Sequence, residues 1–277
     1  MVEPGSFFRR AFDALASLTV PAPCRICREP ISDGSFAPVC AICLDRMPRL
    51  PGPICCGCGR YFPSGVAADT PAPKCQLCRR EVYSFDRARS FAIYENETVR
   101  AITVLKHQPI LPLGHWFARQ LAEMVLAWDE GIFPDVVVPV PLHASRQKER
   151  GYNQADLIAR PLAQRLGLPY LPHALIRTRP RPNKLRLTRK ERWRVVRGAY
   201  STREGRQVDN LRVLLVDDVF TTGATLDACS RALRKAGAVR VAAITAARVV
   251  PEWVVIRGPG LTGGVNPPGP RKASKFL

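Results

Sequence analysis

The chain has 277 residues, 46% of them hydrophobic, which is enough to build one large core or two modest ones and excludes a chain disordered throughout. Its 42 lysines and arginines outnumber 23 acids, and the net charge of +19 favours a polyanionic partner: nucleic acid, a phosphorylated metabolite or an acidic protein surface. No apolar run approaches the roughly 20 residues that cross a bilayer, so we expect no membrane span.

Residues 1–19 are predicted to form a short amphipathic helix, because Phe8, Phe12 and Leu15 recur at helical spacing. The segment is a poor signal peptide, since Asp13 interrupts its apolar stretch and no convincing cleavage site follows. We expect the helix to pack on the protein itself, with attachment to a membrane surface as the alternative. The protein is therefore expected to be cytoplasmic.

Residues 20–82 are predicted to form a small cysteine-rich zinc-ribbon domain, because they carry four CxxC pairs and little periodic apolar pattern. Each half supplies four thiolates, the set that a tetrahedral structural zinc ion binds. Adjacent CxxC thiols make strained, reducible disulfides, so two zinc ions in a reducing compartment are the better interpretation. We favour sequential pairing and leave a cross-braced pairing open. The eight candidate ligands are Cys24, Cys27, Cys40, Cys43, Cys55, Cys58, Cys75 and Cys78.

Two cysteines fall outside the four pairs. Cys56 lies inside the third CxxC and is either a spare thiol or an alternative ligand. Cys229 falls in line with Leu226 and Leu233 on the apolar side of a predicted helix, so we expect a small buried hydrophobic residue.

Residues 83–256 alternate apolar runs with amphipathic segments. The predicted elements are a strand over 91–94, a helix over 115–128, a strand over 135–142, a helix over 154–167, a strand over 211–219, a helix over 224–238 and a strand over 239–250. Strands that are apolar on both faces indicate a parallel sheet covered on both sides. The predicted fold is therefore a doubly wound, mostly parallel α/β sheet, whose ligands lie beyond the carboxyl ends of the strands. The basic, Gly/Pro-rich residues 257–277 are predicted to be disordered.

The stretch VLLVDDVFTTGAT, residues 213–225, sets two acids between a buried strand and a turn. Backbone N–H groups, threonine hydroxyls and a helix N-terminus can converge there on a phosphate, held by Thr221, Thr222, Gly223, Ala224 and Thr225. Asp217 and Asp218 would repel that phosphate, and are placed instead to accept hydrogen bonds from vicinal hydroxyls. A ribose 5-phosphate satisfies both halves. The alternative is an ordinary strand–turn–helix with two solvated aspartates.

These thirteen residues closely resemble the PRPP-binding motif of type I phosphoribosyltransferases, with four hydrophobic residues, two acids and a Thr-Gly loop. The resemblance implies that Asp217 and Asp218, the catalytic pair, hold the ribose 2′- and 3′-hydroxyls. It implies that residues 221–225 hold the 5-phosphate, and that Mg²⁺ binds together with PRPP.

A second stretch, PVPLHASRQKERGYNQADLIA (139–159), resembles the ComF/GntX branch, in which a similar segment lies between a cysteine-rich N-terminus and the PRPP motif. By position, that resemblance assigns pyrophosphate binding to the loop after the strand over 135–142. The alternative for the two arginines is a solvated helix face, and Asn153 and Gln154 either cap the next helix or contact ligand. The pyrophosphate candidates are Pro141, Leu142, His143, Arg146, Arg150 and, more weakly, Lys106.

Residues 177–197 depart from that family pattern. They hold ten lysines and arginines with Glu191 as the one acid, and Lys184 and Val195 stand where relatives usually carry a glutamine and an asparagine. In type I enzymes a flexible hood closes over the active site from this part of the chain, so the departure could alter how the acceptor is handled.

Two functions fit these features. The first is a phosphoribosyltransferase-fold protein that binds PRPP or a related ribose 5-phosphate, in the DNA-uptake pathway of natural transformation that the ComF resemblance implies. The second is a single-stranded nucleic-acid-binding or adaptor protein whose PRPP site is non-catalytic. Its partners would be single-stranded DNA and DNA-uptake or recombination proteins, with Trp193 and Tyr200 as exposed aromatics that stack on bases.

Overall fold

The computed structural model describes residues 23–31, 38–50, 52–62, 73–180, 187–203 and 207–250. The predicted helix over 1–19 and the predicted disordered tail over 257–277 lie outside these residues. Within the described ranges, no helix is both long and apolar enough to cross a membrane.

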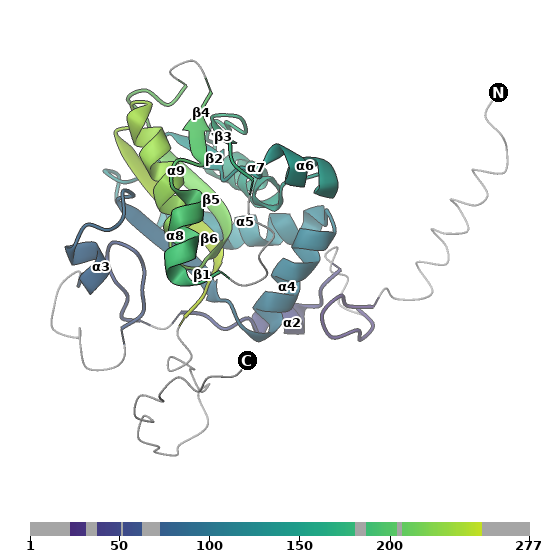
Figure 1. The fold of residues 1–277 in the computed structure, drawn as a ribbon. Coiled ribbons are helices and arrows are strands. Elements are labelled where there is room, and N and C mark those ends of the chain that lie inside the picture. The colour runs from purple at the N-terminus through teal and green to yellow at the C-terminus, as the bar shows by residue number, and fades with distance from the viewer. Residues whose placement is uncertain are drawn as a thin grey trace, which may run out of the picture.

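Helices and strands alternate along most of the described chain (Figure 1). In chain order they are α2 (Ala41–Asp45), α3 (Gln76–Arg79), β1 (Arg87–Ile93), α4 (Asn96–His107), α5 (Leu111–Leu126), β2 (Val136–Pro139), α6 (Ala144–Arg150), α7 (Gln154–Leu166), β3 (Leu175–Arg177), α8 (Arg189–Val196), β4 (Tyr200–Thr202), β5 (Arg212–Phe220), α9 (Ala224–Lys235) and β6 (Arg240–Arg248).

Four strands form one parallel sheet in the order β1-β6-β5-β2, which confirms the predicted fold class. β5 lies inside the sheet, where Val216 pairs with Ile244 of β6 and with Pro139 of β2. Because all four strands run the same way, their carboxyl ends meet at one edge of the sheet. β3 and β4 form a separate antiparallel pair.

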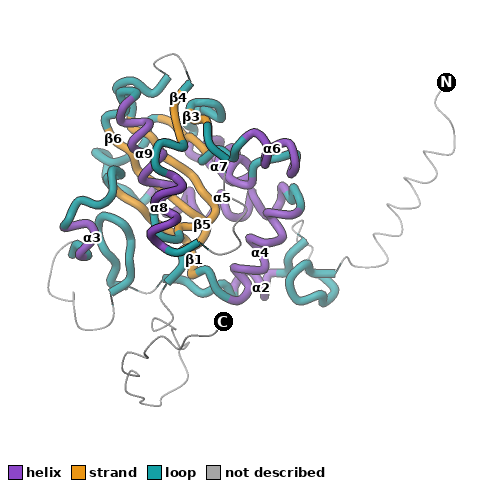
Figure 2. Tube along the Cα trace, viewed as in Figure 1, coloured by secondary structure: helices purple, strands orange, loops and turns teal. Residues whose placement is uncertain are grey.

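Helices cover both faces of this sheet, as Figure 2 shows. α4, α5 and α7 pack on one face, and α8, α9 and the β3–β4 pair pack on the other. Side chains of β5 alternate between the two cores: Leu214 and Val216 face α5 and α7, whereas Val213 and Leu215 face α9. An apolar strand is needed here because neither face is open to water.

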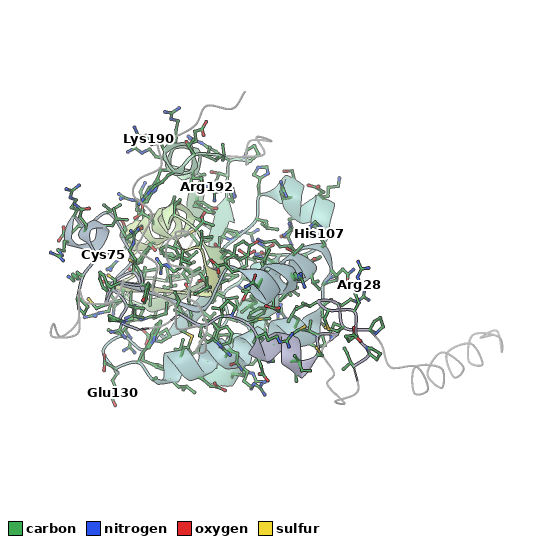
Figure 3. All side chains as sticks on the ribbon, turned by 90° about the horizontal axis from the view of Figure 1, so that it is seen from below. Arg28, Cys75, His107, Glu130, Lys190 and Arg192 are labelled. Carbon is green, nitrogen blue, oxygen red and sulfur yellow. The ribbon has the colours of Figure 1, made fainter. Side chains whose placement is uncertain are left out.

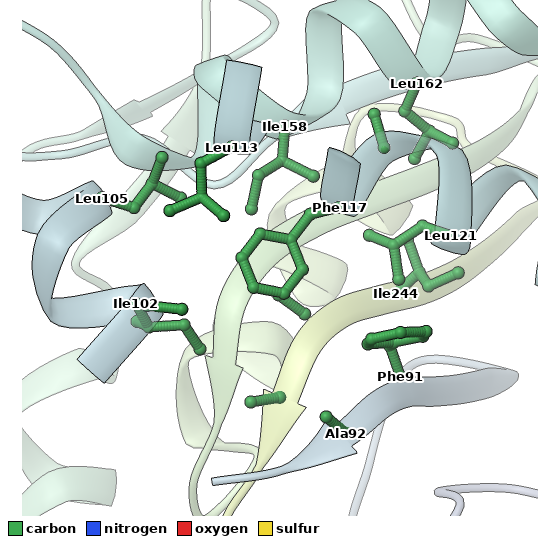
Figure 4. Close-up of a cluster of buried hydrophobic side chains, with 14 of the residues drawn as sticks. Phe91, Ala92, Ile102, Leu105, Leu113, Phe117, Leu121, Ile158, Leu162 and Ile244 are labelled. Carbon is green, nitrogen blue, oxygen red and sulfur yellow. The ribbon is translucent and has the colours of Figure 1, made fainter. Parts of the chain in front are cut away.

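The larger core is centred on Phe117 of α5, which is fully buried and meets Phe91 of β1 edge-on at 6.4 Å (Figure 4). α5 also crosses α7 closely at Gly114. A Cβ on that glycine would lie 2.3 Å from the carbonyl oxygen of Leu157, so only glycine fits the crossing.

The two cysteine-rich segments attach to different faces of the sheet. Cys24, Cys40 and Cys43 join the core that contains α5, whereas Cys55 and Cys58 join the core that contains α9. Figure 1 shows the corresponding helices, α2 and α3, well apart. Neither segment has an apolar core of its own, in keeping with its composition.

Sequence periodicity missed several short elements. The structure adds α4, α6, α8 and the β3–β4 pair, and extends the first predicted strand to Arg87–Ile93. Strands of three residues, such as β3 and β4, are too short to show a period of two. α8 is strongly polar, so it lacks the apolar stripe by which a surface helix is recognised in a sequence.

Candidate functional site

A cavity of about 730 Å³ opens at the carboxyl edge of the sheet. Its walls come from the ends of β2 and β5, the first turn of α9, and helices α6 and α8. This is where a doubly wound sheet binds ligands, and the volume suits a small phosphorylated metabolite.

The acid pair lies within β5, because the strand continues to Phe220 and does not end before the acids as the motif suggested. Asp217 pairs with Thr245 of β6, in register with the rest of the sheet. Both aspartates line the cavity, yet they are only 8% and 6% exposed. The alternative of two solvated aspartates is therefore wrong.

Burial gives the two carboxylates different electrostatic environments. Burial, reinforced by the negative charge of Asp218, raises the pKa of Asp217 well above its usual range. Asp218 is instead neutralised by Lys106, whose Nζ lies 2.9 Å from Asp218 Oδ2. Burial lowers the pKa of Lys106, but the nearby Asp218 charge outweighs this and the net pKa is raised. Lys106 thus lines the cavity while paired with an acid, and its predicted contact with pyrophosphate stays a prediction.

The turn after β5 carries the predicted phosphate cradle. Thr221, Thr222, Ala224 and Thr225 line the cavity, and the backbone N–H groups of the first turn of α9 begin there. Gly223 caps α9 with φ +82°, and it faces Tyr83 on the side away from the cavity.

Aromatic side chains pack against the side of that turn that faces away from the cavity. The Tyr83 hydroxyl donates to the Thr222 carbonyl at 3.2 Å, and the Ser84 N–H donates to Asp227 Oδ1 in α9 at 2.8 Å. The Phe220 ring lies under the guanidinium of Arg248 at 4.0 Å, and Arg248 also donates to the Cys58 carbonyl. The turn is therefore tied to the second cysteine-rich segment.

The loop after β2 forms the opposite wall. Pro141, Leu142 and His143 line the cavity, and His143 Nδ1 accepts from the Ser145 N–H at 3.3 Å to cap α6. Arg146 and Arg150 project into the same cavity from α6.

The next two residues are both buried, and they differ in whether they line the cavity. Asn153 is buried and caps α7, accepting from the Ala155 N–H at 3.1 Å and donating to the Val140 carbonyl at 3.0 Å. Gln154 lines the cavity and accepts from Arg150 at 2.5 Å, which leaves it in reach of a ligand.

Sequence reasoning missed three arginines of the cavity, namely Arg177, Arg189 and Arg192. The available signal was the capping box of α8, in which Thr188 accepts from the Glu191 N–H and the Glu191 side chain accepts in return. Threonine followed three residues later by glutamate marks a helix start, and that start fixes which arginines share a face.

The prediction of exposed aromatics is wrong for Tyr200, and Trp193 is only partly exposed. Tyr200 is 7% exposed and belongs to the core under α9. Trp193 is half-buried and stacks near Tyr83, with ring centroids 6.1 Å apart. The Tyr200 ring is therefore not free to stack on a base, because tertiary packing covers it.

The eight paired cysteines form two groups of four, with all sulfurs of a group within 4.8 Å of one another. Grouping follows the sequence, Cys24 to Cys43 and Cys55 to Cys78, so the pairing is sequential. The Cys27–Cys40 and Cys58–Cys75 sulfurs lie 3.7 and 3.6 Å apart. A tetrahedron with Zn–S bonds of about 2.3 Å has an edge of about 3.8 Å, so each group fits zinc.

The two other cysteines are placed differently from one another. Cys56 belongs to neither group in the described part of the chain. It is therefore a spare thiol and not an alternative ligand. Cys229 is completely buried in α9, as predicted.

Comparison with known proteins matches residues 153–258 to the family described as Phosphoribosyl transferase domain. "DNA utilization protein YhgH" of Salmonella typhi is 30% identical over 227 residues, covering 81% of this chain and 96% of the relative. "Competence protein ComFC" of Bacillus subtilis is 30% identical over 209 residues, covering 72% and 79%. Among solved structures, the glutamine PRPP amidotransferase of B. subtilis covers 47% of this chain and 26% of its own at 27% identity, with a TM-score of 0.31.

The turn after β5 predicts a difference between two glycines that share the same backbone conformation. Gly223→Ala and Gly151→Ala should each cost about 1–2 kcal/mol for placing alanine at φ +82° or +78°. At Gly223 a Cβ would also lie 2.6 Å from the Tyr83 ring, whereas Gly151 has nothing within 4 Å. Gly223→Ala should therefore lose about 1–3 kcal/mol more in urea unfolding. Equal losses would show that the rings do not confine the turn.

The buried acid predicts a pH-dependent stability. In the unfolded chain Asp217 ionises near pH 4, and its folded pKa lies well above that, so between the two values the folded protein holds one more proton. The free energy of unfolding should therefore fall by about 1.4 kcal/mol per pH unit as pH rises through this window. Asp217→Asn lacks this slope and should be the more stable protein at pH 8. Urea titrations from pH 5 to 8 measure both, and parallel profiles contradict the raised pKa.

Proposed function

The chain belongs to the ComF family, whose members carry a phosphoribosyltransferase-like domain, and we propose that it binds PRPP or a related ribose 5-phosphate in the cavity at the end of β5. One observation carries the proposal. A buried acid pair, Asp217 and Asp218, shares a single cavity with a glycine-threonine turn at a helix N-terminus. Few ligands other than a phosphorylated sugar match carboxylates and an anion cradle side by side.

The three parts of PRPP match three walls of the cavity. The 5-phosphate would lie at the N-terminus of α9, held by the turn over 221–225. The ribose hydroxyls would donate to Asp217 and Asp218. The diphosphate would lie against the loop after β2, where His143, Arg146 and Arg150 supply hydrogen-bond donors and positive charge.

As an enzyme, the protein would break the bond between ribose C1 and the diphosphate and transfer the ribose to an amine. Magnesium bound with PRPP would neutralise the diphosphate. Arg146 and Arg150 would stabilise the charge that builds up on the departing diphosphate, and the acid pair would face the positive charge that develops on the sugar. The turn and the acids together would hold the ring in one orientation, so orientation and electrostatics would carry the reaction.

The role that the proposal assigns is DNA uptake in natural transformation, in the cytoplasm. Relatives named for competence and for DNA utilization support it, as does the net charge of +19. A second candidate is a single-stranded nucleic-acid-binding or adaptor protein that uses the PRPP site without turnover. The observation in its favour is the outer side of α8, where Lys190 and Arg194 are exposed and Arg197 follows.

We also propose that each cysteine group holds one structural Zn²⁺. Four thiolates close the coordination of each ion, so the metals would stabilise the fold and take no part in chemistry. The division into a ribbon over 20–82 and a phosphoribosyltransferase-like domain over 83–256 belongs to the same proposal.

The PRPP assignment predicts the effect of neutralising the acid pair. Asp217→Asn/Asp218→Asn should raise the Kd for PRPP with Mg²⁺ by at least about 100-fold in calorimetry, because a hydrogen bond to a charged group is worth about 1.5–3 kcal/mol. Asp129→Asn/Glu130→Gln replaces two exposed acids after α5 in the same way and should leave the Kd unchanged. If wild-type protein shows no heat with PRPP, or the two double variants bind alike, the assignment fails.

The zinc assignment predicts metal content. Wild-type protein should contain two zinc ions per chain by elemental analysis, one for each cysteine group. Cys24→Ser/Cys27→Ser should contain one, since it removes half the ligands of a site. Cys56→Ser should keep both ions, because Cys56 belongs to neither group. Equal metal content in the two variants would falsify the ligand assignment.

A further inference from the structure

One wall of the cavity carries three arginines that the PRPP assignment does not use. We call Arg177, Arg189 and Arg192 the arginine wall. Arg189 and Arg192 are three residues apart on α8 and therefore share a face of the helix. Arg177 ends β3, and its backbone bridges to His143, which sets the arginine wall beside the proposed diphosphate loop.

The arginine wall holds positive charge without a matching acid. In the described part of the chain none of the three arginines forms an ion pair. Arg192 and Arg177 each donate from Nε to a backbone carbonyl, of Leu187 at 3.3 Å and of Arg179 at 3.0 Å. Such bonds do not use the planar fork of terminal N–H groups, which is the part of arginine that recognises phosphate.

Tyr200 carries an unpaired buried hydroxyl on this side of the cavity. Its side chain lines the cavity, and the residue is only 7% exposed. Its hydroxyl makes no well-formed hydrogen bond with a described residue, although Thr225 is a neighbour. Burial raises the pKa of Tyr200, so the hydroxyl keeps its proton and remains a donor. A buried donor without an acceptor is costly unless a ligand supplies one.

We propose that the arginine wall and Tyr200 form a second anion subsite, which binds a phosphate monoester on the ligand beside the ribose. This rests on the proposed function and deepens it, because it names the class of acceptor or co-ligand. A neutral nucleobase would leave three guanidinium groups uncompensated, whereas a phosphate offers two charges and several oxygens for bidentate hydrogen bonds. The phosphate can come from a mononucleotide or from the 5′-end of a nucleic acid strand.

Calorimetry in three stages tests the subsite. PRPP with Mg²⁺ is titrated first, which reads the proposed function alone. At saturating PRPP, uridine 5′-monophosphate is then compared with uridine, and (dT)₄ bearing a 5′-phosphate with the same oligonucleotide lacking it. At least one phosphorylated probe should bind about tenfold or more tightly than its partner, as expected of a charge-assisted contact. Which pair shows the difference identifies the source of the phosphate.

Matched variants of α8 locate the effect. Arg189→Gln/Arg192→Gln should reduce the preference to about twofold, with each measurement made at a PRPP concentration that saturates the variant. Lys190→Gln/Arg194→Gln removes the same charge from exposed side chains outside the cavity and should keep the full preference. Figure 3 shows Lys190 pointing away from the body of the protein and Arg192 on the side that faces it.

The outcomes separate the two claims. PRPP binding without a preference for either phosphorylated probe overturns the subsite and leaves the proposed function standing. If PRPP does not bind, the probes are titrated alone, and the same preference and its loss in Arg189→Gln/Arg192→Gln still decide the subsite. A preference that both α8 variants lose equally reflects overall charge and also overturns it.

Discussion

The packing of aromatic rings behind the turn after β5 is the contact on which the cavity depends. Tyr83 and Phe220 occupy the space next to Gly223 and so restrict how the turn can move relative to the sheet. Phe220 is itself covered by the buried guanidinium of Arg248, which donates to the Cys58 carbonyl. Backbone N–H groups bind an anion strongly only when their orientation is fixed beforehand, and packing against these rings would fix it.

The acid pair lowers the stability of the folded protein. Two carboxylates on neighbouring residues of a buried strand are unfavourable in the absence of ligand. Lys106 compensates Asp218, and Asp217 tends toward its protonated form. If the proposed ribose ligand binds here, its hydroxyl donors would offset part of this cost.

The fold and the floor of the cavity were predictable from local patterns. The apolar runs of β2, β5 and β6, followed by a glycine-threonine turn, specify a parallel sheet with a site at its edge. The wall formed by α8, β3 and β4 was harder to predict, because α8 lacks an apolar stripe and β3 and β4 are three residues each.

Two errors share one physical cause. Trp193 and Tyr200 stand in a highly charged segment that suggested exposure, and the acids of β5 stand next to a turn that suggested solvation. Elements distant in sequence cover them: Tyr83 lies beside Trp193, α9 packs against Tyr200, and β6 pairs with the acid-bearing part of β5. Long-range packing of this kind leaves no trace in the residues on either side.

The bond from Arg248 to the Cys58 carbonyl joins residues 190 positions apart. The ribosome synthesises the four cysteine pairs long before it synthesises β6. A metal ion bound early by Cys55 to Cys78 would therefore lie in a segment that does not yet pack against β6. This cysteine-rich segment is thus synthesised early and fully packed late. The second cysteine-rich segment can therefore complete its packing only after β6 has been synthesised.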